Sequence, residues 1–363
     1  MTSGMPASRQ RSAAPDLVTL SEKDIGDIAC FIARQSGRTR EAVESHLKWF
    51  LLENPALQPE IPLGFGLRSA DRLVGCILCN PQNFHFHDET IFLVGSSSFY
   101  VDETHRGAGG RIFLQYCRLG NRHPLFGTSA NPAAAALWKS AGASPIPYSD
   151  GELFGVHHWP PVAEEFVHRR YSNPILARMA GSSITNLAGL QRRLKIDRGE
   201  AELLHPLNSA EQVMDLPIHG FAAKLTASRD LPYIRWRYFS GVDATVMAFS
   251  FRSRTPGQDV LITVNQRRRG YREQIKTLNV LDVYPEVGPE DWLRIVGALV
   301  ARFRKDVDAI VLRNQSPDQR QMLCARGFQL RAFDAPLGWF LDRARLLPNG
   351  DWYPVPADGD AII

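Results

Sequence analysis

Residues 101–119 constrain the fold more than any other part of this chain. An apolar stretch from about residue 92 to 102 predicts a β-strand, and Gly107, Gly109 and Gly110 follow it closely. Apolar residues at helical spacing begin directly after these glycines, with Ile112 and Phe113. A strand, a glycine-rich loop and a helix N-terminus in immediate succession predict an α/β architecture.

The glycine-rich loop also has the composition of an anion-binding loop. The first backbone N–H groups of a helix have no partner inside the helix and lie at its positive end, and glycines let an anion approach them without obstruction. Residues 106–111 (RGAGGR) provide this bare backbone together with two arginines. The segment therefore predicts a site for a phosphate or pyrophosphate, with a turn that serves only backbone geometry as the alternative.

Length and element order predict two domains of one kind. The chain has 363 residues, whereas a single domain usually has about 100–200. In both halves the apolar patterns predict two paired strands, a further strand, a helix, a strand and a second helix, which suggests two copies of one fold. We expect a flexible tail at residues 1–16, a first lobe at 17–156 and a second lobe at 157–363, with the boundary in the proline-rich stretch 145–161.

Local signals place further elements at the start of the first lobe. Ser21 and Asp24 have the spacing of a capping box and predict a helix through about residue 35, followed by a second helix from 40 to 52. Two apolar runs separated by Ala70 and Asp71 predict an antiparallel hairpin with a tight polar turn. The first lobe is therefore expected to combine antiparallel strands with helices.

Composition excludes several broad classes. Hydrophobic residues are 44% of the chain and charged residues 22%, a balance that fills a core and excludes a wholly disordered chain. The net charge of +4 gives no strong basic field for general nucleic-acid binding. No apolar run is long enough to span a membrane, and the first residues lack the apolar core of a secretion signal. We expect a cytoplasmic protein with no membrane partner and with its five cysteines reduced.

A second motif follows the loop. Residues 131–142 (NPAAAALWKSAG) predict a helix that is closed by Gly142. Loop and helix together resemble the GNAT acyltransferase superfamily, whose pyrophosphate loop has the pattern Arg/Gln-x-x-Gly-x-Gly/Ala and whose next helix commonly has the pattern Asn-x-x-Ala-x-x-Leu-Tyr-x-x-x-Gly-Phe. The matching residues are Arg106, Gly109, Asn131, Ala134, Leu137 and Gly142. The resemblance covers about residues 17–156.

This resemblance implies a fold and a co-substrate. The implied fold is α/β (α+β), with two tandem GNAT-like lobes, each a mixed, mostly antiparallel central sheet flanked by helices. The implied co-substrate is an acyl-coenzyme A, acetyl-CoA first, without a metal; its pyrophosphate would lie on the N–H groups of residues 107–111 and its pantetheine beside the strand end. The residues implied to contact it are Phe99, Tyr100, Val101, Arg106, Gly107, Ala108, Gly109, Gly110, Arg111, Asn131 and Trp138.

Several residues depart from the family pattern. Arg111 stands where the last small residue of the loop is expected, and Ala143 replaces the usual phenylalanine. Trp138 replaces the tyrosine that in many relatives protonates the leaving thiolate, and an indole cannot act as that acid. The strand 92–101 also lacks the glutamate base that some relatives carry. A donor-binding lobe is therefore better supported than a particular catalytic acid or base.

Acyl transfer needs a deprotonated nucleophile and donors for the developing oxyanion. The candidates for the oxyanion are Ser96, Ser98 and the backbone around Ser97 and Phe99. The candidates for the base are Glu152 and His157, near the last strand of the first lobe, and His105 beside the loop. Lone ionisable side chains are more often ordinary surface or structural residues, which is the alternative for each of them.

The second half has no equivalent of the glycine loop. Residues 285–289 (PEVGP) stand at the corresponding place, and their acidity and prolines oppose anion binding. We expect this lobe to be degenerate and to shape the acceptor site. Its most basic stretches are residues 235–238 (RWRY) and 267–269 (RRR) with Arg272. The candidate acceptor-binding residues are Arg235, Arg237 and Tyr238, and the alternative is a solvated hairpin whose arginine stems cover apolar surface.

One pattern resembles a metal site. Cys76 and Cys79, followed by His85 and His87, give four potential ligands. On a strand, residues three apart point to opposite faces, so no metal is predicted.

These observations favour a tandem acyltransferase. The expected reaction moves an acyl group, acetyl first, from coenzyme A to an amine or hydroxyl of a small molecule such as an amino acid or amino sugar. The alternatives are a Fem-type transferase, which takes its donor from aminoacyl-tRNA, and a protein that binds coenzyme A or a partner without catalysis. The near-neutral charge and the pyrophosphate loop argue against the tRNA alternative.

Overall fold

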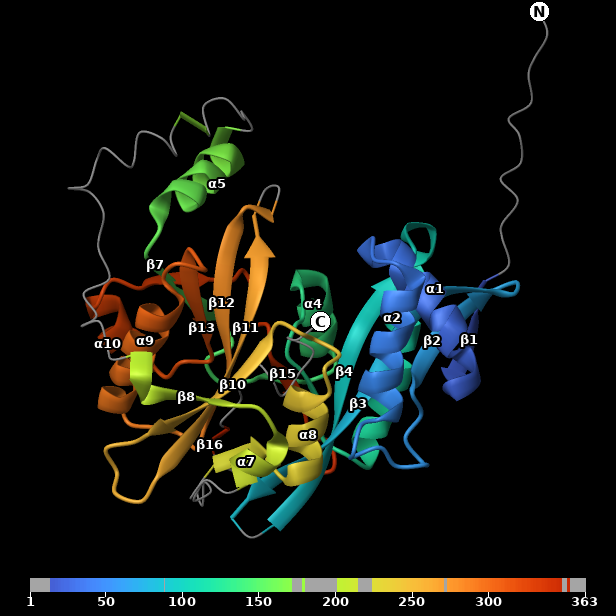
Figure 1. Ribbon diagram of the computed structural model, residues 1–363. Coiled ribbons are helices and arrows are strands. Elements are labelled where there is room, and N and C mark those ends of the chain that lie inside the picture. The colour runs from blue at the N-terminus through green and yellow to red at the C-terminus, as the bar shows by residue number, and fades with distance from the viewer. Residues whose placement is uncertain are drawn as a thin grey trace, which may run out of the picture.

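The computed structural model of the chain describes residues 14–87, 89–171, 178–179, 201–214, 224–270, 273–347 and 351–352. Two sheets lie side by side, and helices flank each of them (Figure 1). This arrangement confirms the predicted α/β fold with two lobes. Most of the predicted tail, residues 1–13, lies outside the described residues, and the first strand begins at Asp16.

The first sheet has nine strands in the described part of the chain. Their order along the main path is β1 (Asp16–Leu20), β2 (Gly64–Ser69), β3 (Arg72–Phe86), β4 (Glu89–Val101), β5 (Leu125–Gly127), β15 (Trp339–Leu341) and β6 (Ser144–Pro145). Off this path, β9 (Lys224–Ala227) pairs with the end of β3, and β16 (Asp351–Trp352) pairs with β9. Only the pairs β4–β5 and β9–β16 are parallel.

The second sheet has seven described strands. Their order is β14 (Gln329–Ala332), β7 (Gly151–Val156), β13 (Ala309–Arg313), β12 (Ile275–Tyr284), β11 (Asp259–Arg269), β10 (Val246–Arg252) and β8 (Leu204–Leu207). Its one parallel pair is β12–β13. Each sheet is therefore mixed and mostly antiparallel, as predicted, and each has a parallel pair near its centre.

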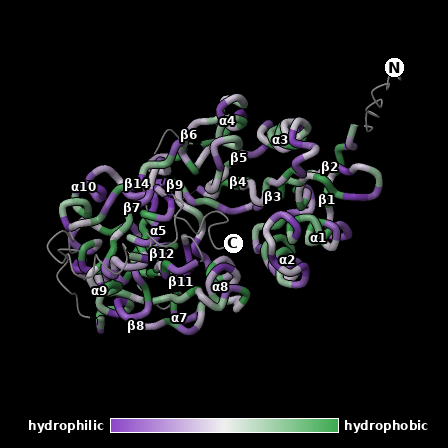
Figure 2. Tube along the Cα trace, turned by 90° about the horizontal axis from the view of Figure 1, so that it is seen from above, coloured by the Kyte–Doolittle hydropathy of each residue, from purple (hydrophilic) through white to green (hydrophobic). Residues whose placement is uncertain are grey.

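Helices cover the sheets. In the first half they are η1 (Glu22–Asp24), α1 (Ile25–Ser36), α2 (Arg40–Leu47), a π turn η2 (Lys48–Leu52), η3 (Glu103–Ala108), α3 (Gly109–Cys117), η4 (Arg118–Asn121) and α4 (Pro132–Ser140). In the second half they are α5 (Trp159–Tyr171), η5 (Ala201–Leu203), α7 (Ala210–Met214), α8 (Leu231–Phe239), α9 (Pro289–Phe303) and α10 (Pro317–Ala325). Figure 2 shows α3 and α4 on one side of the first sheet and α1 and α2 on the other. No helix within the described residues is long and apolar enough to cross a membrane.

The local sequence signals are confirmed at the start of the first lobe. Ser21 and Asp24 form the reciprocal bonds of a capping box ahead of α1. The helix predicted from 40 to 52 is α2 together with the π turn. Strands β2 and β3 form the predicted hairpin, and Ala70 in its turn has a φ of 52°. Short-range signals of this kind are reliable because the whole interaction lies within a few residues.

The two halves exchange strands across the predicted boundary. β7 was expected as the last strand of the first lobe, but it lies in the second sheet, antiparallel to β13 and β14. Its place beside β5 is taken by β15 from the C-terminal half. The segment before β15 also holds the loop after β5, since the Ala130 N–H donates to the Leu337 carbonyl at 2.9 Å. A boundary at residue 156 therefore does not separate the two sheets.

A shared core joins the lobes. One buried cluster contains residues of α1, α2 and the π turn together with residues of α8 and β10. At its centre the indole N–H of Trp49 donates to the carbonyl of Trp236, and the N–H of Trp236 donates to the carbonyl of Trp49, both at 2.9 Å. Because both indole donors are satisfied in an apolar setting, this contact fixes the two halves against each other.

Candidate functional site

Strands β4 and β5 form a fork. They are paired only at Val94 with Leu125 and at Gly95 with Phe126. Tyr116 of α3 lies at the branch point, because its hydroxyl donates to the carbonyl oxygens of Val94 at 2.7 Å and Phe126 at 3.3 Å. Beyond the branch, residues 96–101 have β3 on one edge and no described strand on the other. Backbone groups on that free edge are open to a ligand.

A bulge in β4 directly follows the branch point. Ser98 and Phe99 together lie opposite the single residue Ile77 of β3. Ser98 has a left-handed conformation with a φ of 49°, which is uncommon for a residue with a side chain. A bulge leaves backbone unpaired and re-aims the neighbouring side chains. The strand is therefore shaped here for something other than sheet pairing.

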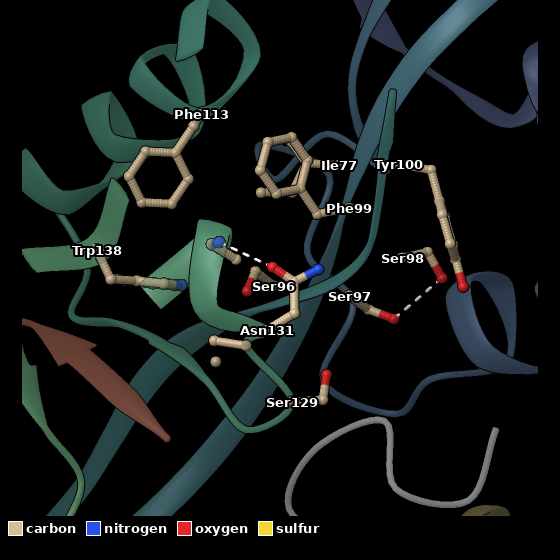
Figure 3. A pocket seen from close by; sticks show the side chains of 13 residues that line it. Ile77, Ser96, Ser97, Ser98, Phe99, Tyr100, Phe113, Ser129, Asn131 and Trp138 are labelled. Carbon is tan, nitrogen blue, oxygen red and sulfur yellow. Dashed lines mark hydrogen bonds between the residues drawn. The ribbon is translucent and has the colours of Figure 1, made fainter. Parts of the chain in front are cut away.

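A pocket with a volume of about 160 Å³ lies in the fork, between β4 and α4. It is lined by Ile77, Ser96, Ser97, Ser98, Phe99, Tyr100, Phe113, Gly127, Ser129, Ala130, Asn131, Ala134 and Trp138. Figure 3 shows the rings of Phe99, Phe113 and Trp138 on one side of the pocket and the serine hydroxyl groups on the other. An apolar wall facing a polar wall suits a small group that carries one polar atom.

Gly127 keeps the inner end of this pocket open. A Cβ atom at this position would lie 2.8 Å from Ser96 Oγ and 3.1 Å from Trp138 Cζ2. Trp138 itself is 2% exposed, and the rings of Phe113 and Tyr116 meet it edge-on at centroid distances of 5.3 and 5.9 Å. The tryptophan cannot retreat in so tightly packed a setting, so only glycine leaves room at residue 127.

Tyr116 joins β4 and β5 behind the pocket, and it does not supply a proton to a group bound there. Burial raises the pKa of Tyr116 well above its ordinary value, the nearby Cys79 and Cys117 raise it further, and a hydrogen bond with Ser96 opposes the rise. A phenol that is so weakly acidic cannot efficiently protonate a thiolate. Tyr116 therefore does not replace the tyrosine that is absent at position 138.

Helix α4 begins at the rim of the pocket. Asn131 caps it, because its Oδ1 accepts from the backbone N–H of Ala134 at 2.9 Å, and Pro132 occupies the first turn. Asparagine at the cap and proline next to it are the residue types that start a helix most sharply. The cap bond is drawn in Figure 3 and fixes the Asn131 amide beside the serines.

The glycine loop forms a 3-10 turn, η3, that continues into α3. The N–H of Gly109 donates to the carbonyl of Arg106 within this turn. A Cβ atom at Gly107 or Gly110 would meet nothing within 4 Å, so the space beside the Cα atom is open at both positions. The guanidinium of Arg106 is 74% exposed and lies 3.8 Å from Glu103. The glycines therefore lie inside a helical stretch that runs from Glu103 to Cys117, beside the exposed Arg106. Anion binding at residues 107–111 stays a prediction.

Arg111 does not obstruct the loop. Its guanidinium donates to the carbonyl of Pro15 at 2.9 Å, ahead of β1. Gly109 packs against the end of β4, since a Cβ atom there would lie 3.2 Å from Val101 Cγ2 and 3.8 Å from Phe99 Cζ. The last residues of β4 therefore connect the pocket with the glycine loop.

Asp102 anchors the loop at its first residue. The carboxylate accepts from Gln35 Nε2 of α1 at 2.7 Å and from Arg72 Nη2 of β3 at 2.7 Å. A loop whose start is held by a helix and a strand keeps its donors in place before any ligand arrives, which lowers the entropic cost of binding.

Most of the residues implied to hold the donor lie together. Phe99, Tyr100, Asn131 and Trp138 line the pocket, as do Ser96 and Ser98 from the oxyanion candidates. Val101 and the loop residues 106–110 continue from it along the end of β4 and the start of α3. Only Arg111 turns away.

The candidate bases are not at the pocket. Glu152 is in the second sheet, 3% exposed and surrounded by arginines, because β7 crossed into that sheet. His157 follows β7 and its Nε2 bonds the Val307 carbonyl at 2.6 Å. His105 precedes the loop, and its Nδ1 bonds Thr104 Oγ1 at 2.9 Å. No aspartate, glutamate or histidine is among the described residues that line the pocket.

The candidate acceptor residues of α8 do not form a site. Arg235 lies on the surface and pairs with Glu211 at 2.5 Å. Arg237 is 2% exposed and lies over the rings of Trp49 and Trp236, at 5.8 and 5.4 Å from their centroids. Tyr238 is buried and its hydroxyl donates to Asp282 at 2.6 Å. Sequence analysis took these residues as one basic surface because it could not see that two of them face the shared core. Of the other basic stretch, Arg272 lies outside the described residues.

Sequence analysis missed part of the pocket. The lining residues that were not predicted as contacts are Ile77, Phe113, Gly127, Ser129, Ala130 and Ala134. Ala134 was named only as a match to the family motif. Gly127 and Ser129 stand directly before the α4 motif, so their position in sequence is the one signal that could have pointed to them. Ile77 lies on a different strand and enters only through the bulge.

The metal-like pattern is split by the sheet. Cys76 packs in the core on the α1 side and Cys79 in the core on the α3 side, as predicted for strand residues three apart. Burial raises the pKa of the Cys76 thiol to about 12. Over the described ranges, no three His, Cys, Asp or Glu side chains are grouped as metal ligands.

Comparison with known proteins identifies the fold. No family model and no curated protein sequence matches the chain. A GCN5-related N-acetyltransferase from Anabaena variabilis matches with a TM-score of 0.52 and 12% identity, over 91% of this chain and 73% of that one. A conserved protein from Enterococcus faecalis, a probable N-acyltransferase, matches with a TM-score of 0.52 and 8% identity, over 91% and 73%. The N-myristoyltransferase of Saccharomyces cerevisiae with bound myristoyl-CoA matches with a TM-score of 0.55 and 10% identity, over 91% and 83%. These likenesses show that the chain has the GNAT fold.

Proposed function

We propose that this chain, which has the fold of the GNAT N-acyltransferases, transfers a short acyl group from coenzyme A to the amine of a small acceptor. The observation that carries the proposal is the order of features along β4, in which the fork pocket, the bulge at Ser98 and the open space at Gly107 and Gly110 follow one another. Such an arrangement offers sites for an acyl group, a pantetheine arm and a pyrophosphate in the order in which acyl-CoA carries them. The yeast structure with bound myristoyl-CoA supports acyl-CoA as the ligand class.

The size of the pocket favours an acetyl group. The pocket volume is about 160 Å³, and Gly127 with Trp138 closes its inner end. A closed inner end suits the thioester sulfur with a short acyl group. A longer chain would pass this end only by displacing Trp138 or Phe113, and both are packed in the core.

Ser98 and its neighbours would stabilise the oxyanion. When the amine attacks the thioester carbon, the carbonyl oxygen gains negative charge, and donors fixed before the reaction lower that barrier. The free edge of β4 after the branch point supplies backbone N–H groups, and Ser96, Ser97 and Ser98 supply hydroxyl groups. Ser97 Oγ and Ser98 Oγ are 3.4 Å apart, so the two can orient each other (Figure 3).

Trp138 would hydrogen-bond the leaving sulfur without protonating it. Figure 3 shows its indole nitrogen on the side of the pocket that faces Ser96. In the transfer the new C–N bond forms, the C–S bond breaks with its electron pair on sulfur, and the ammonium proton passes to solvent. A hydrogen bond to a charged group is worth roughly 1.5–3 kcal/mol, so the indole N–H would stabilise the thiolate, which then takes its proton from water.

The absence of a basic side chain among the described lining residues favours an amine acceptor over a hydroxyl. A neutral amine is a nucleophile without help, whereas a hydroxyl needs a base. We therefore expect the rate to rise with pH along the titration of the acceptor amine itself.

The experiment is an acetyl-CoA turnover assay with a panel of amino acids and amino sugars. The quantity measured is the release of the free thiol of coenzyme A. Turnover with an amine, with a pH midpoint that shifts when a less basic amine is used, supports the proposal. Tight acetyl-CoA binding without thiol release for any acceptor would instead favour a binding protein without catalysis. Absence of acetyl-CoA binding together with salt-dependent tRNA binding would favour a Fem-type transferase.

A further inference from the structure

The second sheet holds a group of charges that the proposed reaction does not use. Glu152 of β7 lies in register between Arg313 of β13 and Arg331 of β14. Directly opposed residues on neighbouring strands share one face of a sheet. Arg269 of β11 reaches the same carboxylate. We name these four residues the arginine cluster.

Three guanidinium groups surround one carboxylate in this cluster. Arg269 Nη1 donates to Glu152 at 3.1 and 3.3 Å, Arg313 Nε at 3.2 Å and Arg331 Nη1 at 3.1 Å. The Glu152 side chain is 3% exposed, whereas the arginine side chains are 29%, 29% and 45% exposed. Burial alone would raise the pKa of Glu152, but the three guanidinium groups outweigh it and lower the pKa overall. The carboxylate is therefore ionised at neutral pH, and the cluster has a net charge of +2 because three cations surround one anion.

Neighbouring acids do not neutralise this excess, because each has an arginine of its own. Asp150, two residues before Glu152, pairs with Arg320 at 2.6 Å. Glu165 of α5 lies against Gly270 and pairs with Arg169. Like charges held so close repel one another at a partly buried site, so an additional anion would be stabilised there.

The cluster also has free donors. Within the described part of the chain, the guanidinium group of Arg313 makes no hydrogen bond besides that of Nε, and the guanidinium group of Arg331 none besides that of Nη1. Arg269 Nη2 donates to Asn279 Oδ1 at 2.8 Å, and Asn279 Nδ2 donates to Asn265 Oδ1 at 3.0 Å. Asn265 is 1% exposed, and its own Nδ2 has no acceptor among the described residues. A buried amide donor without an acceptor is costly and points to a missing polar partner.

We propose that the arginine cluster binds a phosphate group over this face of the second sheet. A phosphate monoester carries close to two negative charges at neutral pH, which matches the excess of the cluster. Guanidinium forks bind phosphate oxygens through paired N–H groups, and Arg313 and Arg331 have such groups free. The phosphate belongs either to a small phosphorylated metabolite or to the free ion, and these two sources are separated by experiment. The proposal does not depend on acyl transfer.

The test is titration of the full chain with inorganic phosphate by calorimetry, at constant ionic strength and without coenzyme A. We expect saturable binding that Arg313→Gln weakens by at least about tenfold. The matched control is Arg252→Gln in β10 of the same sheet, because Arg252 is paired one-to-one with Asp259 at 2.9 Å; it should change the affinity by less than about twofold. Glu152→Gln removes the resident anion and should tighten phosphate binding by about tenfold.

Three results would overturn the proposal. These are no saturable binding to the wild-type chain below about 10 mM phosphate, equal weakening by both arginine variants, or weaker binding by a folded Glu152→Gln variant. A purely structural cluster gives the first result, because the wild-type chain then has no saturable phosphate site. A parallel titration with glycerol phosphate separates the sources: tighter binding than inorganic phosphate indicates a phosphorylated metabolite, and equal binding indicates the free ion. Acetyl-CoA binding is measured separately, so failure here leaves the donor site untouched.

Discussion

The two halves of the chain build the same fork but use it differently. β12 and β13 are paired only from Thr277 to Asn279 before they part, as β4 and β5 do after Gly95. Leu281 of β12 has no partner residue on β11, because Val280 and Asp282 pair with the consecutive residues Val264 and Thr263. This irregularity follows the second fork as the bulge at Ser98 follows the first. In the second half, Val280, Val283 and Trp292 fill the core beside that fork. The topology is therefore shared, whereas the pocket depends on small and polar side chains.

The helices that follow the two forks differ at their N-termini. α3 begins with Gly109, which packs against β4, and Gly110, beside which the space is open. α9 begins with Pro289, Glu290 and Asp291. The Asp291 carboxylate accepts from Ser253 Oγ at 2.5 Å and from the backbone N–H of Arg254 at 3.1 Å. An acid already present at a helix N-terminus excludes a second anion, so the sequence-based expectation of no donor site in this half has a structural reason.

Polar groups beside the second fork are also bonded internally. Asp282 of β12 is fully buried and accepts from Arg229 Nε at 2.6 Å and from the Tyr238 hydroxyl at 2.6 Å. The serines of β4 instead line open space. The comparison teaches that a repeated fold keeps its strand order while a few side chains decide whether open space remains at the fork.

Protonation of His46 should have the largest effect, and it should act on both halves at once. His46 lies in the shared core, and burial together with Arg38 and Arg237 lowers its pKa from 6.5 to about 4. The unfolded chain therefore takes up the proton first as pH falls below 6.5, and stability is lost between pH 6.5 and 4, by up to about 3 kcal/mol. Urea unfolding across this range measures the loss.

His46→Phe is the control for that measurement. It removes the titrating group, so the part of the slope between pH 6.5 and 4 that belongs to residue 46 should disappear. If the free energy of unfolding of the variant falls with pH as steeply as that of the wild type, other groups cause the acid destabilisation. The shared core would then not couple the two halves through His46.

Paired substitutions in the two forks come next. Gly127→Ala places a methyl group against Ser96 and Trp138 and should lower kcat/KM for acetyl-CoA by about 100-fold, with a smaller effect on unfolding. Leu312 in β13 lies in the core beside the second fork and is fully buried. Leu312→Ala should cost about 3 kcal/mol of stability and leave acetyl-CoA affinity unchanged at a temperature where the chain is folded. If both variants lower activity and stability to the same extent, the two forks do not differ in function as described.

Substitution of Trp138 gives the smallest predicted effect. Trp138→Phe removes the indole N–H and keeps an aromatic ring, and it should lower kcat by about tenfold while acetyl-CoA affinity stays similar. Trp138→Tyr restores a donor and should recover activity. In the second half, Leu323 is the corresponding residue, because it follows the cap of α10 at the same spacing as Trp138 follows the cap of α4. Its side chain has no hydrogen-bond donor. Equal activity of Trp138→Phe and wild type would show that the indole N–H does not contribute to the reaction.

Local sequence signals predicted the parts of the site that lie within one stretch of chain. The glycine loop, the Asn131 cap and the hairpin before β4 all depend on neighbours within a few residues. The two-lobe fold followed from the repeated element order. The family resemblance grouped Phe99, Tyr100 and Trp138, and these three residues do line one pocket; that the pocket holds the donor stays a prediction.

The remaining features depend on long-range contacts that no local pattern records. β7 pairs with β13, more than a hundred residues away in sequence, and this moved Glu152 out of the first sheet. Arg237 resembles a surface cation by its neighbours in sequence, but the rings of Trp49 and Trp236 enclose it. The left-handed Ser98 has no sequence signal, because serine is not a residue type that favours this conformation.

The most direct test of the donor site is calorimetric titration with acetyl-CoA of the wild-type chain and three variants. Gly110→Asp adds a negative charge in open space at the N-terminus of α3, Gly110→Asn adds the same bulk without charge, and Gly288→Asp adds the charge at the cap of α9. Wild type, Gly110→Asn and Gly288→Asp should bind with similar affinity, and Gly110→Asp should bind at least about tenfold more weakly. Absence of binding by wild type, or equal binding by Gly110→Asp, would contradict the assignment of acyl-CoA to the first fork.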